Sequence, residues 1–343
     1  MNKTHSGRSS SLPDLLKRYS GPILIGAVFV LFSVEAETFL TAFNMLQIVH
    51  HGSILGLFSL GFTVTVISGE IDLSFSNLGA LIGVLVAIFF VKADFGVVVG
   101  LLTATLFGIG IGAFNGYIIA YRGCKSLITT IAMSSICWGV TFMLTGGGDE
   151  VRGMMPDAFA FIGQGYVGIV PCSVFIFTLC YLISFIIITR LPFGHHLYAI
   201  GFNSEVARAS GINVRFLKFI AFVISGFLSS VAGLIITSRL GSGQPIVGAQ
   251  FLLEGIAAAF FGVAISTQDK PSVLGTLQGV LLLSIIFNGV TLLGLPLYLK
   301  NIIQGGILVG ALVSKEARTL VDVFYNLKMR IDKRHREAVG SRS

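Results

Sequence analysis

The chain has 343 residues, of which 54% are hydrophobic and only 11% are charged, and its formal net charge at pH 7 is +7. A soluble domain carries roughly a quarter charged residues, so this composition excludes an ordinary water-soluble fold. The basic residues gather in the tails and in alternate loops, which indicates contact with membrane lipid and excludes a nucleic-acid partner.

Apolar runs fill nearly everything from Gly21 to Ser314. A helix that crosses the hydrocarbon needs about 20 largely apolar residues, and breakers divide the chain into about ten such segments. The predicted fold class is therefore an all-α membrane protein, a polytopic bundle of about ten transmembrane helices. The expected spans are 21–34, 44–68, 74–91, 96–119, 126–145, 166–189, 216–238, 251–267, 272–291 and 294–313.

The first apolar run, from Pro22 to Val34, has the length of a signal-peptide core. The residues that follow it, Glu35, Ala36 and Glu37, make a poor cleavage site, and further spans come after them. We therefore predict a retained first transmembrane helix behind a polar tail over residues 1–20.

Two carboxylates interrupt the apolar pattern between the second and third spans, in the sequence G-E-I-D-L-S over residues 69–74. Ionisable groups near membrane depth are costly unless they face water or a partner, so Glu70 and Asp72, flanked by Gly69 and Ser74, indicate a functional segment. A cytoplasmic turn in which Asp72 or Ser74 caps the third helix through its free amides is an equally good interpretation. The two interpretations are compatible.

Glycines recur four residues apart in the fourth span, at Gly108, Gly112 and Gly116. This spacing puts a smooth strip on one face of a helix and lets a neighbouring helix approach closely. The pattern predicts tight packing, not chemistry.

Several spans also carry polar side chains, which could line a substrate path or only bond to neighbouring helices. From them we select Asn115, Thr129 and Asn288 as candidate pathway residues; Thr130 and Glu254 are of the same kind.

The loop between the sixth and seventh spans carries the signals of a short helix. Asn203 or Ser204 is a good N-cap, Glu205 would lie in the positive first turn, and Gly211 is a natural stop. A short, capped, polar helix on the cytoplasmic surface can dock a partner; a plain amphipathic connector explains the spacing slightly better.

The basic residues also predict the orientation. With a cytoplasmic N-terminus, 19 of the 23 lysines and arginines fall in the tails and interior loops, and Lys92, Arg152, Arg239 and Lys300 fall outside. This asymmetry places both termini in the cytoplasm. Residues 315–336 fit either an amphipathic helix on the inner membrane surface or a loose basic tail.

Signatures of catalysis are missing from the sequence: it has no G-x-x-x-x-G-K-[ST] phosphate loop, no H-E-x-x-H and no G-x-S-x-G. The four cysteines are scattered, without metal-ligand spacing. We therefore expect no catalytic residues, no metal site and no cofactor in this chain, so that a transporter of this kind must take its energy from elsewhere.

Residues 69–74 resemble the G-G-I-D-L-S signature of the ribose-type sugar permeases of bacterial ABC importers, the family that includes xylose, galactose and autoinducer-2 permeases. The stretch from Phe193 to Ile212 is similar to the interior loop that docks on the ATPase in that family. The likeness runs over roughly residues 44–313. Within the signature, Glu70 replaces the second glycine. Three further features depart from the family pattern: a polar turn over 266–271 replaces a glycine-rich one, Lys125-Ser126 replaces a Pro-Phe or Pro-Ala pair, and Glu254 stands where the family commonly has Asp.

The resemblance implies a permease subunit of an ATP-binding-cassette importer that moves a sugar or sugar-like molecule across the bacterial inner membrane into the cytoplasm. Residues 21–314 would form the permease domain, between the cytoplasmic tails 1–20 and 315–343. Separate cytoplasmic ATP-binding subunits would hold ATP and Mg²⁺, so this chain would not be an enzyme. Further partners would be a second permease subunit, identical or related, and a periplasmic or lipid-anchored sugar-binding protein.

Site residues follow from the same resemblance. The expected gating or signature residues are Gly69, Glu70, Asp72 and Ser74, and the expected ATPase-docking residues are Asn203, Ser204, Glu205, Ala207, Arg208 and Gly211. A secondary transporter driven by an ion gradient is the alternative, because it would also have about ten helices interrupted by glycines.

Overall fold

A computed structural model describes residues 12–265, 270–296, 298–310 and 313. The predictions for the C-terminal tail 315–343, for most of the N-terminal tail and for residues 266–269 of the polar turn lie outside this part.

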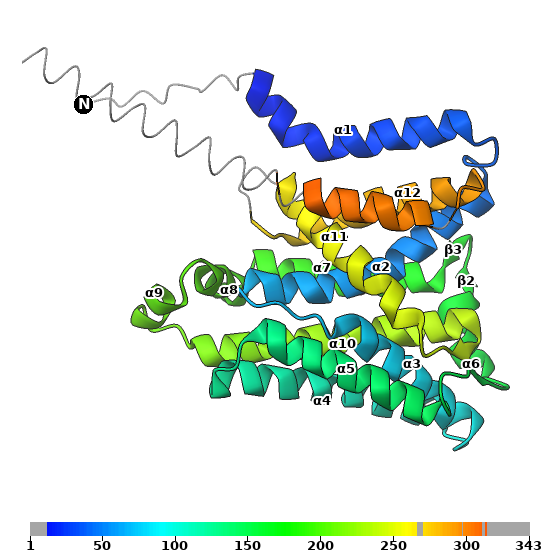
Figure 1. Ribbon diagram of the computed structural model, residues 1–343, viewed down its shortest axis with the longest axis horizontal. Coiled ribbons are helices and arrows are strands. Elements are labelled where there is room, and N and C mark those ends of the chain that lie inside the picture. Colours follow the sequence, from blue (N-terminus) through cyan, green and yellow to red (C-terminus); the bar gives the residue numbers. More distant parts are fainter. Residues whose placement is uncertain (1–11, 266–269, 297, 311–312, 314–343) are drawn as a thin grey trace, which may run out of the picture.

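The described chain is almost entirely helical (Figure 1). In chain order its elements are α1 (Leu12–Glu35), α2 (Ala42–Ile67), α3 (Phe75–Val91), α4 (Val97–Arg122), α5 (Ser126–Leu144), β1 (Val151–Arg152), α6 (Asp157–Gln164), β2 (Tyr166–Val167), β3 (Val170–Pro171), α7 (Cys172–Thr189), α8 (Pro192–Phe202), α9 (Ser204–Ala209), α10 (Val214–Leu240), β4 (Ser242–Gly243), α11 (Val247–Ala264) and α12 (Val273–Leu292). Residues 298–310 are also helical.

Seven of the described helices are long and apolar enough to cross a membrane: α2, α4, α5, α7, α10, α11 and α12. Two shorter apolar helices, residues 21–35 of α1 and all of α3, accompany them. The prediction of an all-α polytopic membrane protein is confirmed.

One predicted boundary is wrong. The sixth span was expected to begin at residue 166, but residues 166–171 form the hairpin β2–β3, in which Val167 pairs with Val170. Gly168 adopts a left-handed backbone in the turn, with φ of 65°, and glycine is the residue that reaches this conformation without strain. Helix α7 therefore starts only at Cys172.

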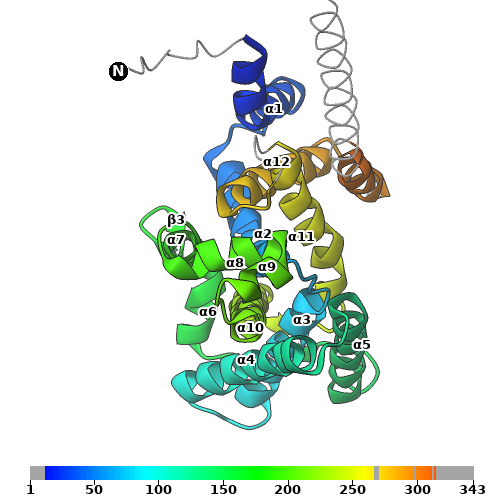
Figure 2. The same ribbon diagram turned by 90° about the vertical axis from the view of Figure 1, so that its left-hand side faces the viewer.

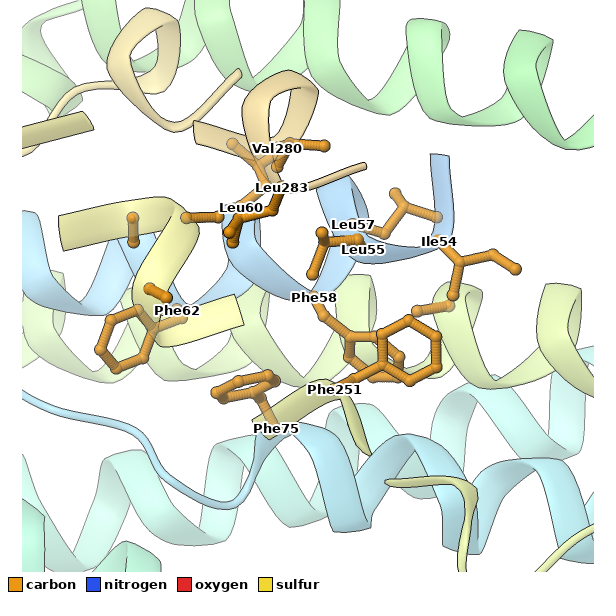
Figure 3. Packing of buried hydrophobic residues seen from close by; sticks show 14 of the residues in the cluster. Ile54, Leu55, Leu57, Phe58, Leu60, Phe62, Phe75, Phe251, Val280 and Leu283 are labelled. Atoms are coloured by element: carbon orange, nitrogen blue, oxygen red, sulfur yellow. The ribbon is translucent and has the colours of Figure 1, made fainter. Parts of the chain in front are cut away.

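Helix α2 is the centre of the bundle. Figure 3 shows its side chains Leu55, Phe58 and Phe62 packed among residues of α3, α11 and α12. The Phe58 ring lies 5.2 Å from that of Phe251 on α11 and 5.9 Å from that of Phe75 on α3. By contrast, α4, α5 and α7 expose many large apolar side chains, as expected of helices that face lipid.

Helices α4 and α10 pack through the predicted glycine strip. A Cβ added to Gly112 would lie 2.5 Å from the carbonyl oxygen of Phe222 on α10, and one added to Gly226 would lie 2.6 Å from that of Gly108. At Gly116 the nearest α10 atom, the carbonyl oxygen of Phe219, would be 2.9 Å away. The two backbones thus touch, and the prediction of close helix approach is confirmed.

The two ends of the bundle differ. Figure 1 shows α8 and α9 at its left-hand end, and α6 with the β2–β3 hairpin at the right. At the right-hand end β1 and β4 pair, with Val151 opposite Gly243, and Glu150 accepts hydrogen bonds from Arg152 and Ser242. Arg152 also holds the pKa of the Glu150 carboxyl below its ordinary value.

The α4–α10 contact predicts a position-specific effect of added volume. We expect Gly112→Val to lower the thermal stability of the purified protein in detergent, because overpacking against backbone costs about 1–3 kcal/mol or more. Gly110→Val is the matched control, since nothing lies within 4 Å of a Cβ at that position. Equal melting temperatures for the two variants would contradict the described packing.

Candidate functional site

The chain leaves helical structure inside the bundle, between α2 and α3. After Ile67 it turns at Gly69, where φ is 80°, and runs extended until α3 begins at Phe75. Figure 3 shows this thin segment entering α3 beside the Phe75 ring. Asp72 and Ser74, with exposures of 2% and 0%, are buried, so the signature is not a solvent-exposed turn. We call residues 69–74 the signature segment.

Helix α5 supplies hydrogen-bond partners for the extended backbone. The Ile71 N–H donates to the Ser126 hydroxyl (3.2 Å) and the Leu73 N–H to the Thr130 hydroxyl (3.0 Å). The single proton of the Thr130 hydroxyl faces two carbonyls, that of Ser126 in its own helix (2.9 Å) and that of Ile71 (3.2 Å). Non-helical backbone is tolerated at membrane depth only when its polar groups are satisfied. Ser126, noted above only as part of a departure from the Pro-Phe or Pro-Ala pair of the resembled family, is therefore part of the site.

The Asp72 carboxylate connects the signature segment to α10 and α4. Its Oδ1 accepts from the Ser74 N–H (2.9 Å) and hydroxyl (2.6 Å), and its Oδ2 accepts from the Ser225 hydroxyl (2.7 Å). Asn115 donates from Nδ2 to the Ser74 oxygen (3.0 Å). Asn115, predicted to line a pathway, thus joins the signature network, and its buried Oδ1 has no partner among the described residues.

The capping prediction holds for neither residue as stated. Ser74 is the N-cap of α3, but its side chain makes no capping hydrogen bond to that helix. Asp72 accepts from the amide of Ser74, which is the N-cap residue and precedes the first helical residue, Phe75. Its carboxylate still lies at the positive end of α3, where a negative charge is favoured.

The signature segment touches the predicted docking loop. A Cβ on Gly201, near the end of α8, would lie 2.2 Å from the Ile67 carbonyl oxygen, and one on Gly69 would lie 3.3 Å from the Gly201 Cα. Only glycine at both positions allows this approach. Figure 2, seen from this end of the molecule, shows α8 and α9 in front of α2 and α10.

Helix α9 has the predicted caps. The Asn203 side chain accepts from the amides of Glu205 (3.0 Å) and Val206 (3.1 Å), and Gly211 ends the segment with φ of 85°. Ala207 is buried against the bundle, whereas Glu205 and Arg208 are exposed. The helix therefore exposes charged side chains on its outer face, and the apolar side chain of Ala207 attaches it to the bundle.

Helix α8 also holds the segment before α12. The Tyr198 hydroxyl donates to the Pro271 carbonyl (2.9 Å), and the Lys270 ammonium lies 4.6 Å from the centre of the Phe202 ring. Burial raises the pKa of Tyr198, so the hydroxyl keeps its proton and remains a donor at neutral pH.

Glu70, the residue that departs from the family signature, forms an ion pair with Lys218 on α10. The two side chains are 15% and 18% exposed. They line a polar cavity of about 410 Å³. Its wall also includes Lys125, Ser126, Ser204, Arg208 and Arg215. The structure thus brings the signature residue Glu70 and the predicted docking residues Ser204 and Arg208 to one cavity.

Two predicted pathway residues lie elsewhere. The Thr129 hydroxyl, on the exposed face of α5, bonds to the Lys125 carbonyl of its own helix (3.0 Å). Asn288 pairs with Asn44 through two reciprocal amide hydrogen bonds of 2.9 and 2.7 Å, which join α12 to the start of α2. A pathway role for either residue stays a prediction.

Comparison with known proteins places this site in a family context. The family described as branched-chain amino acid transport system / permease component matches residues 44–312. The chain is 32% identical to the ribose import permease protein of Haemophilus influenzae over 88% of this chain and 93% of that protein. It is 31% identical to the ribose import permease protein of Escherichia coli K12 (91% and 97% covered) and 29% identical to the xylose transport system permease protein of H. influenzae (85% and 94%). No solved structure matches the chain.

The Glu70–Lys218 ion pair predicts a coupled response to mutation. We expect Glu70→Gln and Lys218→Met each to destabilise the protein by about 1–3 kcal/mol, because each leaves a largely buried polar group unpaired. The double variant should recover part of this loss. Thermal unfolding in detergent measures all three.

Arg215→Met is the control, since this cation lines the same cavity but is exposed; its change should stay within about 0.5 kcal/mol. A double variant that loses the full sum of the two single losses would show that the pair is not coupled.

Proposed function

This chain belongs to the branched-chain amino acid transport system / permease component family, and on that premise we propose that it is the permease subunit of an ATP-binding-cassette importer for a sugar or sugar-like molecule. The observation that carries the mechanism is the backbone contact between Gly201 and the turn at Ile67–Gly69. It connects a cytoplasmic docking element directly to an unwound segment inside the bundle.

A sugar is the substrate class that the relatives favour. Those compared above are named for ribose and xylose import, and a D-allose transport system permease of E. coli is 28% identical over 86% of this chain. These names also favour an ATP-binding-cassette importer over a secondary transporter. The individual sugar would be selected largely by the binding protein that delivers it.

The chain is a multi-pass protein of the bacterial cytoplasmic (inner) membrane. Within this setting we propose about ten spans: the seven long apolar helices, the two shorter ones and residues 298–310. Both termini would lie in the cytoplasm, because the cavity beside α9 is lined by four of the basic residues that the positive-inside rule places there.

Energy would enter through α9. Two cytoplasmic ATP-binding subunits, which hold ATP and Mg²⁺, would dock on the exposed face that carries Glu205 and Arg208, while this chain holds no cofactor. When they close, the apolar attachment at Ala207 would make α8 move with α9. The Gly201 contact would then displace the signature segment and, through Asp72, the helices α4 and α10.

The rigid coupling suits a two-state switch. Close-packed contacts such as Gly69 on Gly201 do not deform continuously, so a small displacement selects between discrete arrangements. A second permease subunit would complete the path across the membrane, and a periplasmic or lipid-anchored sugar-binding protein would deliver the substrate to the opposite face.

Removing the charges on α9 tests the docking role. We expect Glu205→Ala/Arg208→Ala to abolish sugar-stimulated ATP hydrolysis and uptake in the reconstituted importer, because both side chains lie on the exposed face. The control is Glu37→Ala/Lys92→Ala, an exposed pair at the opposite end of the bundle, which should transport normally. Normal uptake by the α9 variant would rule out docking at this helix.

The exposed thiol of Cys124, in the turn between α4 and α5, tests the orientation. We expect a membrane-impermeant maleimide to label it in inside-out vesicles and not in intact spheroplasts. Cys124→Ser should remove the labelling of the inside-out vesicles. Labelling from the outside would reverse the proposed topology.

A further inference from the structure

A second group of polar side chains lies at the end of the bundle opposite α9. Gln47 and His51 lie in the first ten residues of α2, Arg239 in the last turn of α10, and Glu254 eight residues into α11. Figure 1 shows that the start of α2, the end of α10 and the start of α11 converge at the right-hand end. We call these four residues the distal cluster.

The contacts within the distal cluster use only part of its hydrogen-bonding capacity. Arg239 Nη2 donates to Gln47 Oε1 (2.9 Å), an ordinary interhelical bond. His51 Nε2, however, lies 3.6 Å from Glu254 Oε2, which is beyond hydrogen-bond distance. Glu254 Oε2 therefore has no hydrogen-bond partner among the described residues.

A neighbouring histidine shows the same deficit. His50 is 6% exposed, and its Nε2 also has no partner in the described part of the chain. Buried polar atoms are nearly always paired with protein, water or a ligand. Helices α2 and α11 are in contact, and each leaves one such atom unpaired at this end of the bundle, which indicates that a polar guest completes the cluster.

Stacking on an aromatic ring fixes the position of the His51 side chain for such a guest. Its ring stacks on Phe251 with centroids 5.8 Å apart, and Phe251 in turn packs on Phe58 in the core. The His51 side chain nevertheless keeps 31% of its surface exposed and that of Glu254 keeps 15%. His51 can therefore be reached from outside the bundle, and the enclosed Glu254 Oε2 lies 3.6 Å behind its Nε2.

The charges of the cluster select the class of guest. Arg239 and Lys300 act electrostatically on the histidines and on Glu254, respectively, so a free cation is repelled. An anion would meet the carboxyl of Glu254. Hydroxyl groups both donate and accept, and they match a site that combines guanidinium, imidazole, amide and carboxyl groups.

From this geometry we propose that His51, Glu254 and Arg239 form a binding station for a neutral polyhydroxyl substrate on the entry side of the permease. The inference rests on the proposed function and deepens it, since it assigns to the sugar a place in this chain. A plain interhelical clamp would instead use the polar atoms against each other and leave none unpaired.

The test measures sugar transported per ATP hydrolysed. The complete importer is purified through this chain, reconstituted in proteoliposomes with its binding protein and supplied with radiolabelled ribose, xylose or allose. For Glu254→Gln and His51→Leu we expect this ratio to fall about tenfold, the effect of one charge-assisted hydrogen bond. Sugar-stimulated ATP hydrolysis should persist, because α9 is untouched, and its persistence shows that the variants fold and assemble.

Two further variants sharpen the result. Thr105→Val on α4 removes a hydroxyl that bonds to Leu101 of its own helix, and it should keep the wild-type ratio. Glu254→Asp keeps the carboxyl and should restore part of the coupling that Glu254→Gln loses. A wild-type ratio in both Glu254→Gln and His51→Leu would overturn the station.

Failure of the proposed function gives a different outcome. In that case the wild-type importer would move none of the three sugars, and this result would refute the binding station together with the proposed function. A wild-type importer that transports sugar while the variants remain fully coupled refutes the station alone.

Discussion

The structure depends on one constraint: a backbone amide or carbonyl buried in the membrane must find a hydrogen-bond partner. Between Ile67 and Phe75 the chain abandons the helix that would satisfy these groups automatically. The hydroxyls of Ser126 and Thr130 and the carboxylate of Asp72 take over that role. The break is stable because α5 offers Ser126 and Thr130 to its amides, while Ser225 of α10 holds Asp72 and Asn115 of α4 binds Ser74. The packing of three helices and the course of the signature segment therefore depend on each other.

This dependence means that a displacement of the signature segment reaches several helices at once. A continuous helix would pass a displacement along its own axis, whereas an unwound segment held by side chains passes it to every helix that holds it. The predicted docking element touches the segment through the pair Gly69 and Gly201. Glu70 of the segment and Arg208 of α9 also line one cavity. A movement of α9 thus has a short route of direct contacts to α3, α4, α5 and α10.

The departures from the family signature are compensated locally. Glu70, where the resemblance expects a glycine, pairs with Lys218. Ser126, where it expects the second residue of a Pro-Phe or Pro-Ala pair, accepts a hydrogen bond from the Ile71 amide. Each replacement adds an interaction to the same small region, which is therefore more strongly held together than the signature alone requires. At the other end of the bundle, His50 and Glu254 keep buried polar atoms that have no hydrogen-bond partner among the described residues.

The sequence by itself determined the membrane class, the helix positions, the close α4–α10 approach and the caps of α9, because these follow from hydropathy, glycine spacing and local hydrogen bonding. It also drew attention to residues 69–74, since two carboxylates in an apolar run are conspicuous. Only the tertiary structure decided the partners: that Ser225 donates to Asp72 and Asn115 to Ser74, that Asn288 pairs with Asn44, that Lys218 pairs with Glu70 and that residues 166–171 form a hairpin. Most of these contacts join residues more than 40 positions apart, and no local pattern encodes which helix faces will meet.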